Sequence, residues 1–339
     1  MFRRRPEAGV LKNLLVTGGL GFIGSNFIRH ILKGNKGLRV VNLDLLTYAS
    51  GRDNLRDLEG NKNYTFVKGD ICSGKTVSAL LKKYSIDTVV NFAAETHVDR
   101  SISDAAPFFR TNYSGVINLI DCSMKYGGIR KFVQISTDEV YGSILRGSFT
   151  EKSPLMPGSP YSASKAGADL ALLAYHNTYS FPAVIARGTN NFGPFQYPEK
   201  LIPLFIINAL RGSEMPVYGD GQNVRDWLFV EDFCRGIAAV IKSGSAGEIY
   251  NIGGGCEKKN IEVARMIALK LKAPAGRIVY VADRAGHDRR YSVSSHKIKK
   301  ELGFSVSGDF EKNLDKTLKW YKKEVSWWKG KLNKRSACL

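Results

Sequence analysis

The segment ISTDEVYG, from Ile135 to Gly142, places a hydroxyl and two carboxyl groups directly after the apolar run KFVQI. Thr137, Asp138 and Glu139 thus follow one another at the end of an expected buried strand. One interpretation is a helix cap or a solvated turn, which needs no chemistry. The other is acid–base catalysis, because like charges raise the pKa of one of two neighbouring carboxyl groups, so that one donates a proton and the other accepts one.

A second candidate pair lies in the motif YSASK. Tyr161 and Lys165 are four residues apart and therefore share one face of an expected helix. A lysine ammonium beside a phenol stabilises the phenolate and lowers the pKa of the phenol, which allows tyrosine to act as a general base near neutral pH. This spacing is common by chance. It gains meaning with Thr137 upstream, whose hydroxyl can hold the substrate oxygen that Tyr161 deprotonates.

The motif VTGGLGFIG predicts a dinucleotide site. It places Gly18, Gly21 and Gly24 between an expected strand and an expected helix, where backbone N–H groups can approach a pyrophosphate. Asp44 ends the next expected strand. A carboxylate there can bind both ribose hydroxyls of an adenosine and would repel the 2′-phosphate of NADP. The expected cofactor is therefore NAD.

The elements that must position these residues are short apolar runs alternating with helical patterns. The expected strands are NLLVTGG, LRVVNLDLL, TFVKGDI, DTVVNFAA and KFVQIS. Continuous Val/Ile/Leu strands separated by helices predict a parallel sheet covered on both faces. We expect an α/β fold: a Rossmann-type doubly wound parallel sheet with a smaller, mixed α/β C-terminal substrate-binding region. The expected division is an NAD-binding domain over 1–188, with a returning segment near 226–245, and a mostly substrate-binding domain over 189–339.

The amino-acid composition limits the cellular compartment that we expect. Of 339 residues 43% are apolar, yet no run approaches the roughly 18 apolar residues of a membrane span. The basic start MFRRRPEAGV, with Arg3 to Arg5, reads as a short tail and not as a signal peptide, because no apolar stretch follows it. Five cysteines without C-x-x-C spacing favour a reduced, cytoplasmic setting and no zinc or other metal site.

The charge is unusual, with 50 Lys+Arg against 31 Asp+Glu giving +19. Such an excess favours polyanionic partners such as nucleic acid, a membrane surface or phosphorylated small molecules. The basic residues are scattered, however, and a generally basic surface needs no function. We therefore expect a phosphorylated small molecule, and neither a membrane nor a nucleic acid, as the partner.

Seven motifs together carry a family resemblance: NFAAETHVDRSI, STDEVYG, SPYSASKA, NNFGPFQYPEKLIPL, VYGDGQNVRDWLFVEDF, YNIGG and DRAGHDRRY. They resemble the extended short-chain dehydrogenase/reductase superfamily and, within it, the dTDP-glucose 4,6-dehydratases. The resemblance runs from about residue 14 to residue 328. The adjacent Asp-Glu pair is its most specific part, since relatives that only epimerise a sugar lack it.

The resemblance implies a hydro-lyase that uses NAD to convert a nucleoside-diphosphate hexose, most simply dTDP-glucose, into a 4-dehydro-6-deoxy sugar and water. Oxidation at C4 acidifies the C5–H, water leaves from C5 and C6, and the hydride returns to C6. By resemblance, Tyr161 is the base at C4, assisted by Lys165. Glu139 is the base at C5, Asp138 is the acid at C6, and Thr137 holds the substrate.

The resemblance also assigns binding residues. The cofactor set is Gly18, Gly21, Phe22, Ile23, Gly24, Asp44, Thr47, Asp70, Ile71, Ala93, Ala94, Thr111, Tyr161, Lys165 and Asn191. The substrate set is Thr96, Thr137, Asn190, Lys200, Leu201, Pro216, Val217, Tyr218, Arg225, Asn260, Arg284 and His287. A helix cap is the alternative role for Asp70. Leu45 and Ala285 depart from the lysine and proline usual in the family.

Two alternatives stay open. One is a UDP-sugar 4,6-dehydratase or another extended-family epimerase or decarboxylase. The other is a non-enzymatic, NAD-binding scaffold for nucleic acid, which the complete Thr137, Asp138, Glu139, Tyr161 and Lys165 set disfavours. The superfamily habit of pairing through two helices implies a homodimer, here through helices starting near Tyr113 and Tyr161. The apolar residues expected to give the first of these helices more than one apolar face are Val116, Ile117, Leu119 and Ile120.

Overall fold

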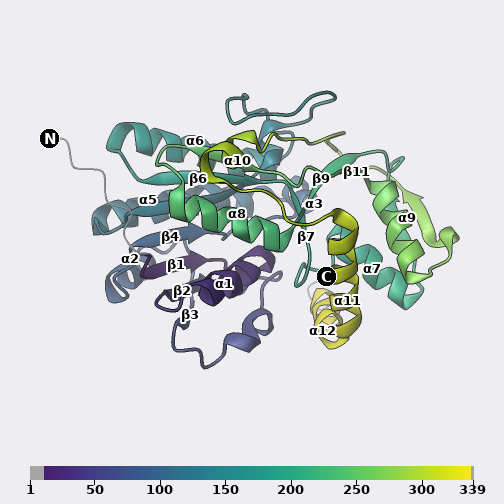
Figure 1. Cartoon of the computed structure of the whole chain (residues 1–339), viewed down its shortest axis with the longest axis horizontal. Helices are drawn as coiled ribbons and strands as arrows, with labels where there is room; N and C mark the ends of the chain where they lie inside the picture. Colours follow the sequence, from purple (N-terminus) through teal and green to yellow (C-terminus); the bar gives the residue numbers. More distant parts are fainter. Residues whose placement is uncertain (1–10, 337–339) are drawn as a thin grey trace.

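The structure is a computed structural model, and it describes residues 11–336 of the chain (Figure 1). The basic tail at Arg3 to Arg5 and Cys338 lie outside the described residues.

The larger part of the molecule is built on a seven-stranded sheet in the order β10-β6-β5-β4-β1-β2-β3. Every neighbouring pair in it is parallel. Its strands are β1 (Asn13–Thr17), β2 (Arg39–Asp44), β3 (Tyr64–Lys68), β4 (Thr88–Asn91), β5 (Lys131–Thr137), β6 (Ala183–Gly188) and β10 (Ile249–Ile252). The chain order reverses between β1 and β4, which is where such sheets bind ligands.

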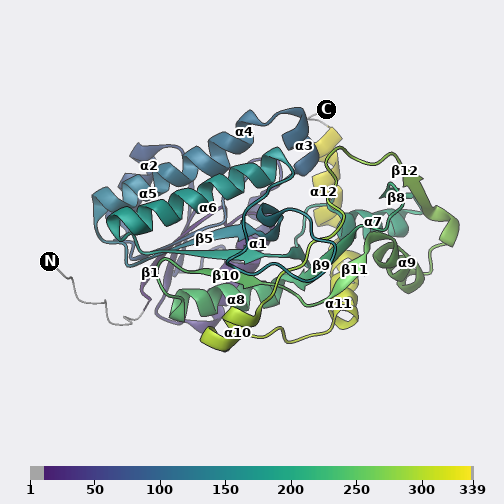
Figure 2. The ribbon, with the colours of Figure 1, turned by 90° about the horizontal axis from the view of Figure 1, so that it is seen from above.

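Helices cover both faces of this sheet, as Figure 2 shows. One face carries α1 (Phe22–Gly34), α8 (Val230–Ser243) and α10 (His296–Leu302), and the other carries α2 (Gly74–Lys83), α5 (Gly115–Tyr126) and α6 (Pro160–Tyr179). Both faces are buried, so the strands read as continuous apolar runs: Leu14, Leu15 and Val16 of β1 are all fully buried. The expected doubly wound α/β fold is confirmed.

Short helices join these elements near the carboxyl ends of the strands. They are η1 (Arg52–Leu58), α3 (Val98–Ser103), α4 (Ala106–Phe108), η2 (Phe109–Ser114) and η3 (Asp138–Tyr141). Two of them, η2 and η3, contribute residues to the site described below.

The smaller region has its own core and two small sheets. The three-stranded sheet has the order β11-β9-β7, and β8 pairs with β12. The elements are β7 (Asn190–Phe192), α7 (Leu201–Arg211), β8 (Met215–Tyr218), β9 (Val224–Phe229), β11 (Glu257–Lys259), α9 (Asn260–Leu271), η4 (Ala275–Arg277), β12 (Ile278–Val281), α11 (Phe310–Lys323) and α12 (Val325–Ser336). Aromatic side chains dominate its core, among them Phe192, Trp227, Phe310, Trp327 and Trp328.

The chain leaves the large sheet after β6 and later returns to it. The helix α8, the strand β10 and the helix α10 all pack with the large sheet, although they follow residue 189. We propose a two-domain division on this basis, with the returning segment extended beyond 226–245 to include β10 and α10.

Candidate active site

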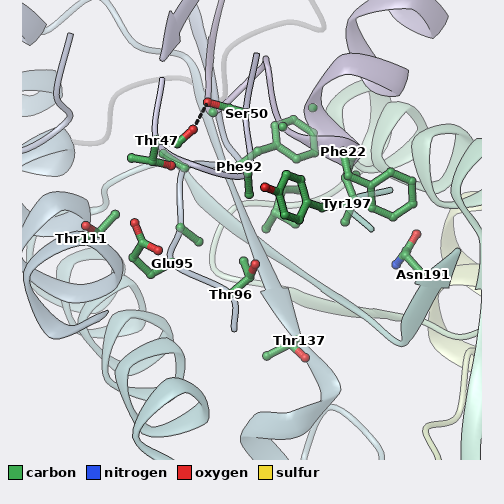
Figure 3. A pocket seen from close by; sticks show the side chains of 18 of the residues that line it. Phe22, Thr47, Ser50, Phe92, Glu95, Thr96, Thr111, Thr137, Asn191 and Tyr197 are labelled. Atoms are coloured by element: carbon green, nitrogen blue, oxygen red, sulfur yellow. Dashed lines mark hydrogen bonds between the residues drawn. The ribbon is translucent and has the colours of Figure 1, made fainter. Parts of the chain in front are cut away.

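A cavity at the carboxyl ends of the parallel strands is lined by both the glycine turn and the acid–base residues (Figure 3). Thr47 and Ser50 lie on one side of this cavity, and Thr137 and Asn191 on another. The expected site residues that line it are Gly18, Gly21, Phe22, Ile23, Gly24, Asp44, Thr47, Asp70, Ile71, Ala93, Ala94, Thr96, Thr111, Thr137, Asp138, Glu139, Tyr161, Lys165, Asn190, Asn191 and Lys200. Segments far apart in the sequence thus meet in one place.

The glycine turn leaves no room for side chains. Gly18 has φ +65°, and a Cβ on it would lie 2.6 Å from the backbone nitrogen of Ala93. At Gly24 a Cβ would lie 2.5 Å from the carbonyl oxygen of Gly18. The helix α1 begins after Gly21 with no side-chain cap, so its first N–H groups remain for an anion.

Asp44 ends β2 with its carboxyl group held from three directions. It accepts hydrogen bonds from Leu20 N at 2.9 Å, Leu46 N at 2.8 Å and Ser50 Oγ at 3.1 Å. Burial raises the pKa of Asp44, while these hydrogen bonds favour its charged form. The carboxyl group is thereby fixed in the cavity wall.

Asp70 follows β3 and accepts from Cys72 N at 2.8 Å and from Arg110. Burial works to raise the pKa of Asp70, but these two donors outweigh it, and the pKa is lowered. The cap of α2 is Ser73, which accepts from Thr76 N at 3.3 Å. The alternative role of helix cap therefore belongs to Ser73.

Thr137 ends β5 and caps η3. Its Oγ1 accepts from Glu139 N at 3.2 Å and donates to Asp138 Oδ1 at 3.2 Å. The helix-cap interpretation is thus true, and it is compatible with a place in the cavity wall. Asp138 is 2% exposed, and its Oδ2 has no hydrogen-bond partner within residues 11–336.

The two carboxyl groups have different surroundings. Burial, then Glu139 and Asp226, hold the pKa of Asp138 well above its ordinary value. Burial also raises the pKa of Glu139, but the cations Arg284, Arg225 and Lys200 oppose this shift. Asp138 therefore favours its protonated form more strongly than Glu139 does.

Tyr161 lies in the first turn of α6, which Ser159 caps through a reciprocal pair with Ser162. Burial and the carboxyl groups of Glu139 and Asp138 raise the pKa of Tyr161, and a hydrogen bond with Thr137 opposes the shift. The net shift of the Tyr161 pKa in the protein by itself is therefore upward, because burial and two nearby acids dominate. The assistance of Lys165 to the phenolate stays a prediction.

Lys165 lies one turn further along α6. Its Nζ donates to the carbonyl oxygen of Ile135 at 2.6 Å. Burial lowers the pKa of Lys165 to about 8, and Asp169 works in the opposite direction.

Polar groups of β7 and the following loop complete the cavity on the substrate side. Asn190 Oδ1 and Asn191 Oδ1 are buried without a hydrogen-bond partner in the described part of the chain. Lys200 Nζ donates to the carbonyl oxygen of Thr96 at 2.8 Å, and burial lowers the pKa of Lys200. Buried polar atoms without partners are rare, so these point to a ligand.

The remaining expected substrate residues lie outside the cavity lining: Leu201, Pro216, Val217, Tyr218, Arg225, Asn260, Arg284 and His287. Several of them form polar contacts with acidic residues or backbone carbonyl groups. Arg284 lies 3.6 Å from Asp99, His287 Nδ1 lies 2.6 Å from Asp283, and Arg225 donates to the carbonyl oxygen of Asp288 at 2.9 Å.

Val217 differs from its neighbours on β8. Its side chain is 2% exposed and packs in the apolar core of the smaller region. Its assignment to the substrate site stays a prediction. Its neighbour on β8, Tyr218, is 41% exposed and hydrogen-bonds Asp99 at 3.3 Å, so alternation along the strand turns Val217 inward.

The cavity also contains residues that the sequence did not single out: Ser50, Glu95, Gln196, Tyr197 and Glu199. Glu199 accepts from Tyr48 Oη at 2.9 Å and lies 3.7 Å from Arg100. Its signal was its place directly before Lys200 in PEK. Glu95 had a similar signal, because it lies between Ala94 and Thr96 in the motif NFAAETHVDRSI.

Comparisons with known proteins agree with this geometry. The profile of the GDP-mannose 4,6 dehydratase family matches residues 15–317. A dTDP-glucose 4,6-dehydratase of Actinoplanes sp. is 47% identical over 320 residues, covering 93% of this chain and 99% of the relative.

Two crystal structures are similar as well. The dTDP-glucose 4,6-dehydratase of Streptomyces venezuelae, with NAD and TYD bound, is 48% identical with a TM-score of 0.92. That of Bacillus anthracis, in complex with NAD, is 46% identical with a TM-score of 0.89. Each match covers 94% of this chain and 99% of the other.

The parallel sheet, the glycine turn and the Tyr-Lys pair define a member of the NAD(P)-binding epimerase/dehydratase class. Within that class, the chain belongs to the family of dTDP-glucose 4,6-dehydratases. The resemblance found in the sequence is confirmed. Within residues 11–336, no helix combines the length and the apolar character that crossing a membrane requires.

Proposed function

We propose that this protein dehydrates dTDP-glucose to dTDP-4-dehydro-6-deoxy-glucose and water with NAD as the hydride carrier. The observation that carries the proposal is that Asp138, Glu139 and Tyr161 line the same cavity as Gly18 and Asp44. A hydride carrier and an acid–base set beside one hexose are what this reaction requires.

The residues present fit NAD. The glycine turn offers uncapped N–H groups to a pyrophosphate, and the buried Asp44 carboxyl group suits a ribose diol and opposes a 2′-phosphate. Asn191 adds an unpartnered amide oxygen near the place expected for the nicotinamide. When bound, NAD supplies a hydride acceptor for C4 and returns that hydride to C6.

Tyr161 begins the reaction by taking the proton of the C4 hydroxyl as the C4 hydride leaves. Thr137 holds the same oxygen through its Oγ1. Because burial and two acids raise the pKa of Tyr161, the phenolate needs positive charge nearby. The ammonium of Lys165 would supply it, and a bound oxidised nicotinamide would add to it.

Glu139 and Asp138 then act in turn on the 4-keto sugar. Glu139 removes the acidified C5 proton, and the cations facing it keep it available as a base. Asp138, held protonated by burial, gives its proton to the C6 hydroxyl, which leaves as water. Glu139 returns a proton to C5 as the hydride reaches C6, so the reaction has no net redox change. The proton that Tyr161 took from the C4 hydroxyl balances the one that Asp138 gave to the departing water, and transfer between the two groups through solvent completes the cycle.

The substrate's diphosphate requires cations beyond the acid–base set. We assign Arg225, Arg284 and Lys200 to the diphosphate, because all three act electrostatically on the same cavity wall at Glu139. His287 and Asn260 complete this side. Tyr218 and Pro216, which are more exposed than Val217, face the nucleotide base.

The test uses purified protein with NAD and one nucleotide sugar at a time: dTDP-, UDP- or GDP-glucose. We expect keto-deoxy product, detected by its absorbance in alkali, from dTDP-glucose at a kcat/KM at least about tenfold above the others. A preference for UDP-glucose would agree with the dehydratase reaction but would contradict the assignment of dTDP-glucose as the substrate. No keto sugar from any of the three would overturn the function.

We further propose a homodimer formed through η2, α5 and α6. Phe109, Tyr113, Met124, Leu170 and Tyr179 are large apolar or aromatic side chains at least 37% exposed on these neighbouring helices. Several exposed apolar side chains on neighbouring helices favour a partner surface.

The apolar residues that the sequence predicted for this interface are not the exposed ones named above. Val116, Leu119 and Ile120 are at most 1% exposed and pack in the core beneath the sheet, so they stabilise the fold and not a dimer. A cytoplasmic location is proposed on the cysteines, since Cys72, Cys122, Cys234 and Cys256 are all free thiols.

A further inference from the structure

The C-terminal helix α12, yellow in Figure 1, is connected to the cofactor turn by a chain of three hydrogen bonds. Trp327 Nε1 donates to Asn54 Oδ1 at 2.8 Å, and Asn54 Nδ2 donates to the carbonyl oxygen of Leu20 at 2.7 Å. Leu20 belongs to the glycine turn, and its N–H donates to Asp44 Oδ2 at 2.9 Å. The chain therefore ends on the carboxyl group assigned to the ribose.

The donors and acceptors around Asn54 allow only one orientation of its side-chain amide. An indole N–H only donates, so Trp327 fixes the carbonyl end of the Asn54 amide toward itself. The NH₂ end of Asn54 must then face Leu20, where it finds an acceptor. Asn54 and Leu20 are each 1% exposed, so water cannot replace a lost partner without rearrangement.

A second contact supports the same segment from α12. Lys331 is 2% exposed, and its Nζ lies 2.8 Å from Asp53 Oδ1. The same ammonium packs against Gly51, where a Cβ would lie only 2.5 Å from it. Gly51 directly follows Ser50, which lines the cavity and hydrogen-bonds Asp44. The helix thus supports the ribose side of the cavity at two points.

We propose that Trp327 is a positioning residue for the cofactor. It orients Asn54, which holds the carbonyl group of Leu20. Through the backbone of Leu20, whose N–H donates to Asp44, it holds the carboxyl group of Asp44 toward the ribose. Trp327 itself does not line the cavity, so its effect passes through Asn54. The inference rests on the proposed function, because it requires that the cavity take NAD.

The same helix offers a matched control. Trp328 is 3% exposed, and its Nε1 donates to the carbonyl oxygen of Tyr321 at 2.9 Å, within the C-terminal helices. Trp327→Phe and Trp328→Phe each remove one buried indole N–H from α12. Only Trp327→Phe breaks the chain to Asp44.

The experiment is a calorimetric titration of NAD into the full-length wild type, both tryptophan variants and Asn54→Ala, with thermal melting of each. We expect Trp327→Phe and Asn54→Ala to weaken NAD binding by roughly three- to tenfold, the effect of one or two buried hydrogen bonds. Trp328→Phe should stay within about twofold of the wild type, although its melting temperature falls similarly. The KM for dTDP-glucose at saturating NAD should be unchanged in Trp327→Phe.

Three outcomes would overturn the inference. Equal NAD affinity in the wild type and Trp327→Phe would show that the chain does not position Asp44. Equal weakening in both tryptophan variants would assign the effect to general packing of α12. If the wild type itself fails to bind NAD, the proposed function falls and takes this inference with it. If Trp327→Phe does not fold, the NAD affinity of Asn54→Ala decides instead: weaker binding supports the inference, and unchanged binding contradicts it.

Discussion

The Nζ atom of Lys165 lies 2.6 Å from the carbonyl oxygen of Ile135, so a charged hydrogen bond joins α6 to β5, beside the bond from Ser136 Oγ to Asp169 Oδ2 at 2.9 Å. The helix carries Tyr161 and the strand ends at Thr137. Lys165 therefore helps to connect the two elements whose hydroxyls are assigned to the same sugar oxygen. Its protonation state matters for geometry as well as for charge.

Activity is expected to fall as the pH rises through about 8, because burial lowers the pKa of Lys165 from 10.5 to about 8 and catalysis needs its ammonium form. Stability has the opposite sign: between about 8 and 10.5 the unfolded chain binds the proton that the folded protein has lost, so this group adds stability as pH rises. The measurement is a profile of kcat/KM against pH. In Lys165→Arg the decline of kcat/KM on the alkaline side should move to higher pH. A decline at the same pH as in the wild type would show that another group causes it.

The two adjacent acids should be separable by isotope exchange. Glu139→Gln should abolish deuterium uptake at C5 in heavy water, because no base removes that proton. Asp138→Asn should retain C5 exchange while releasing no keto-deoxy sugar, because water cannot leave without its proton. Each variant should lower kcat by about 100-fold or more. Exchange in Glu139→Gln, or product from Asp138→Asn at the wild-type rate, would contradict the assignments.

Replacing the ribose carboxylate should change cofactor preference. Asp44→Ala removes an acceptor for the diol and the negative charge that opposes a 2′-phosphate, so NAD binding should weaken roughly tenfold and NADP binding should strengthen relative to it. Titrations of both cofactors into one preparation measure the ratio. An unchanged NAD:NADP ratio would show that Asp44 does not face the ribose.

The close approach at the glycine turn predicts a stability loss with an internal control. Gly18→Ala places a Cβ 2.6 Å from Ala93 N at φ +65°, whereas Gly212 has φ +67° and open space around its Cβ position. Gly212→Ala should cost about 1 kcal/mol of unfolding free energy from backbone strain alone, and Gly18→Ala at least about 2 kcal/mol more from the clash. Denaturant unfolding measures both, and equal costs would contradict the clash.

The sequence predicted what depends on neighbouring residues in the chain. The apolar strands and the glycine turn are local signals, and parallel strands bring their carboxyl ends to one edge, so Gly18 and Thr137 had to meet. The fold class and the family followed. The hydrogen bond from Tyr48 to Glu199 in the cavity wall depends on packing between distant segments, which no local pattern records.

The pKa shifts and the long-range contacts could not be predicted from the sequence, because they too depend on how distant segments pack. The pKa of Tyr161 is set by burial and by acids that the fold brings near it, and its net shift is upward. Val116 is apolar in either a core or an interface, and only the structure assigns it to the core. Trp327 and Asn54 are 273 residues apart and have no pattern in common.

The proposed dimer can be tested on its exposed apolar face. Leu170 on α6 is 56% exposed among Phe109, Tyr113 and Tyr179, whereas Leu269 on α9 is 80% exposed in the smaller region. A buried, unpaired carboxylate strongly destabilises an interface, so Leu170→Glu should shift the protein to monomer at micromolar concentration. Leu269→Glu should leave the oligomeric state unchanged. Analytical ultracentrifugation of the wild type and both variants measures this. A wild-type monomer, or a Leu170→Glu dimer as tight as the wild type, would show that this face does not pair.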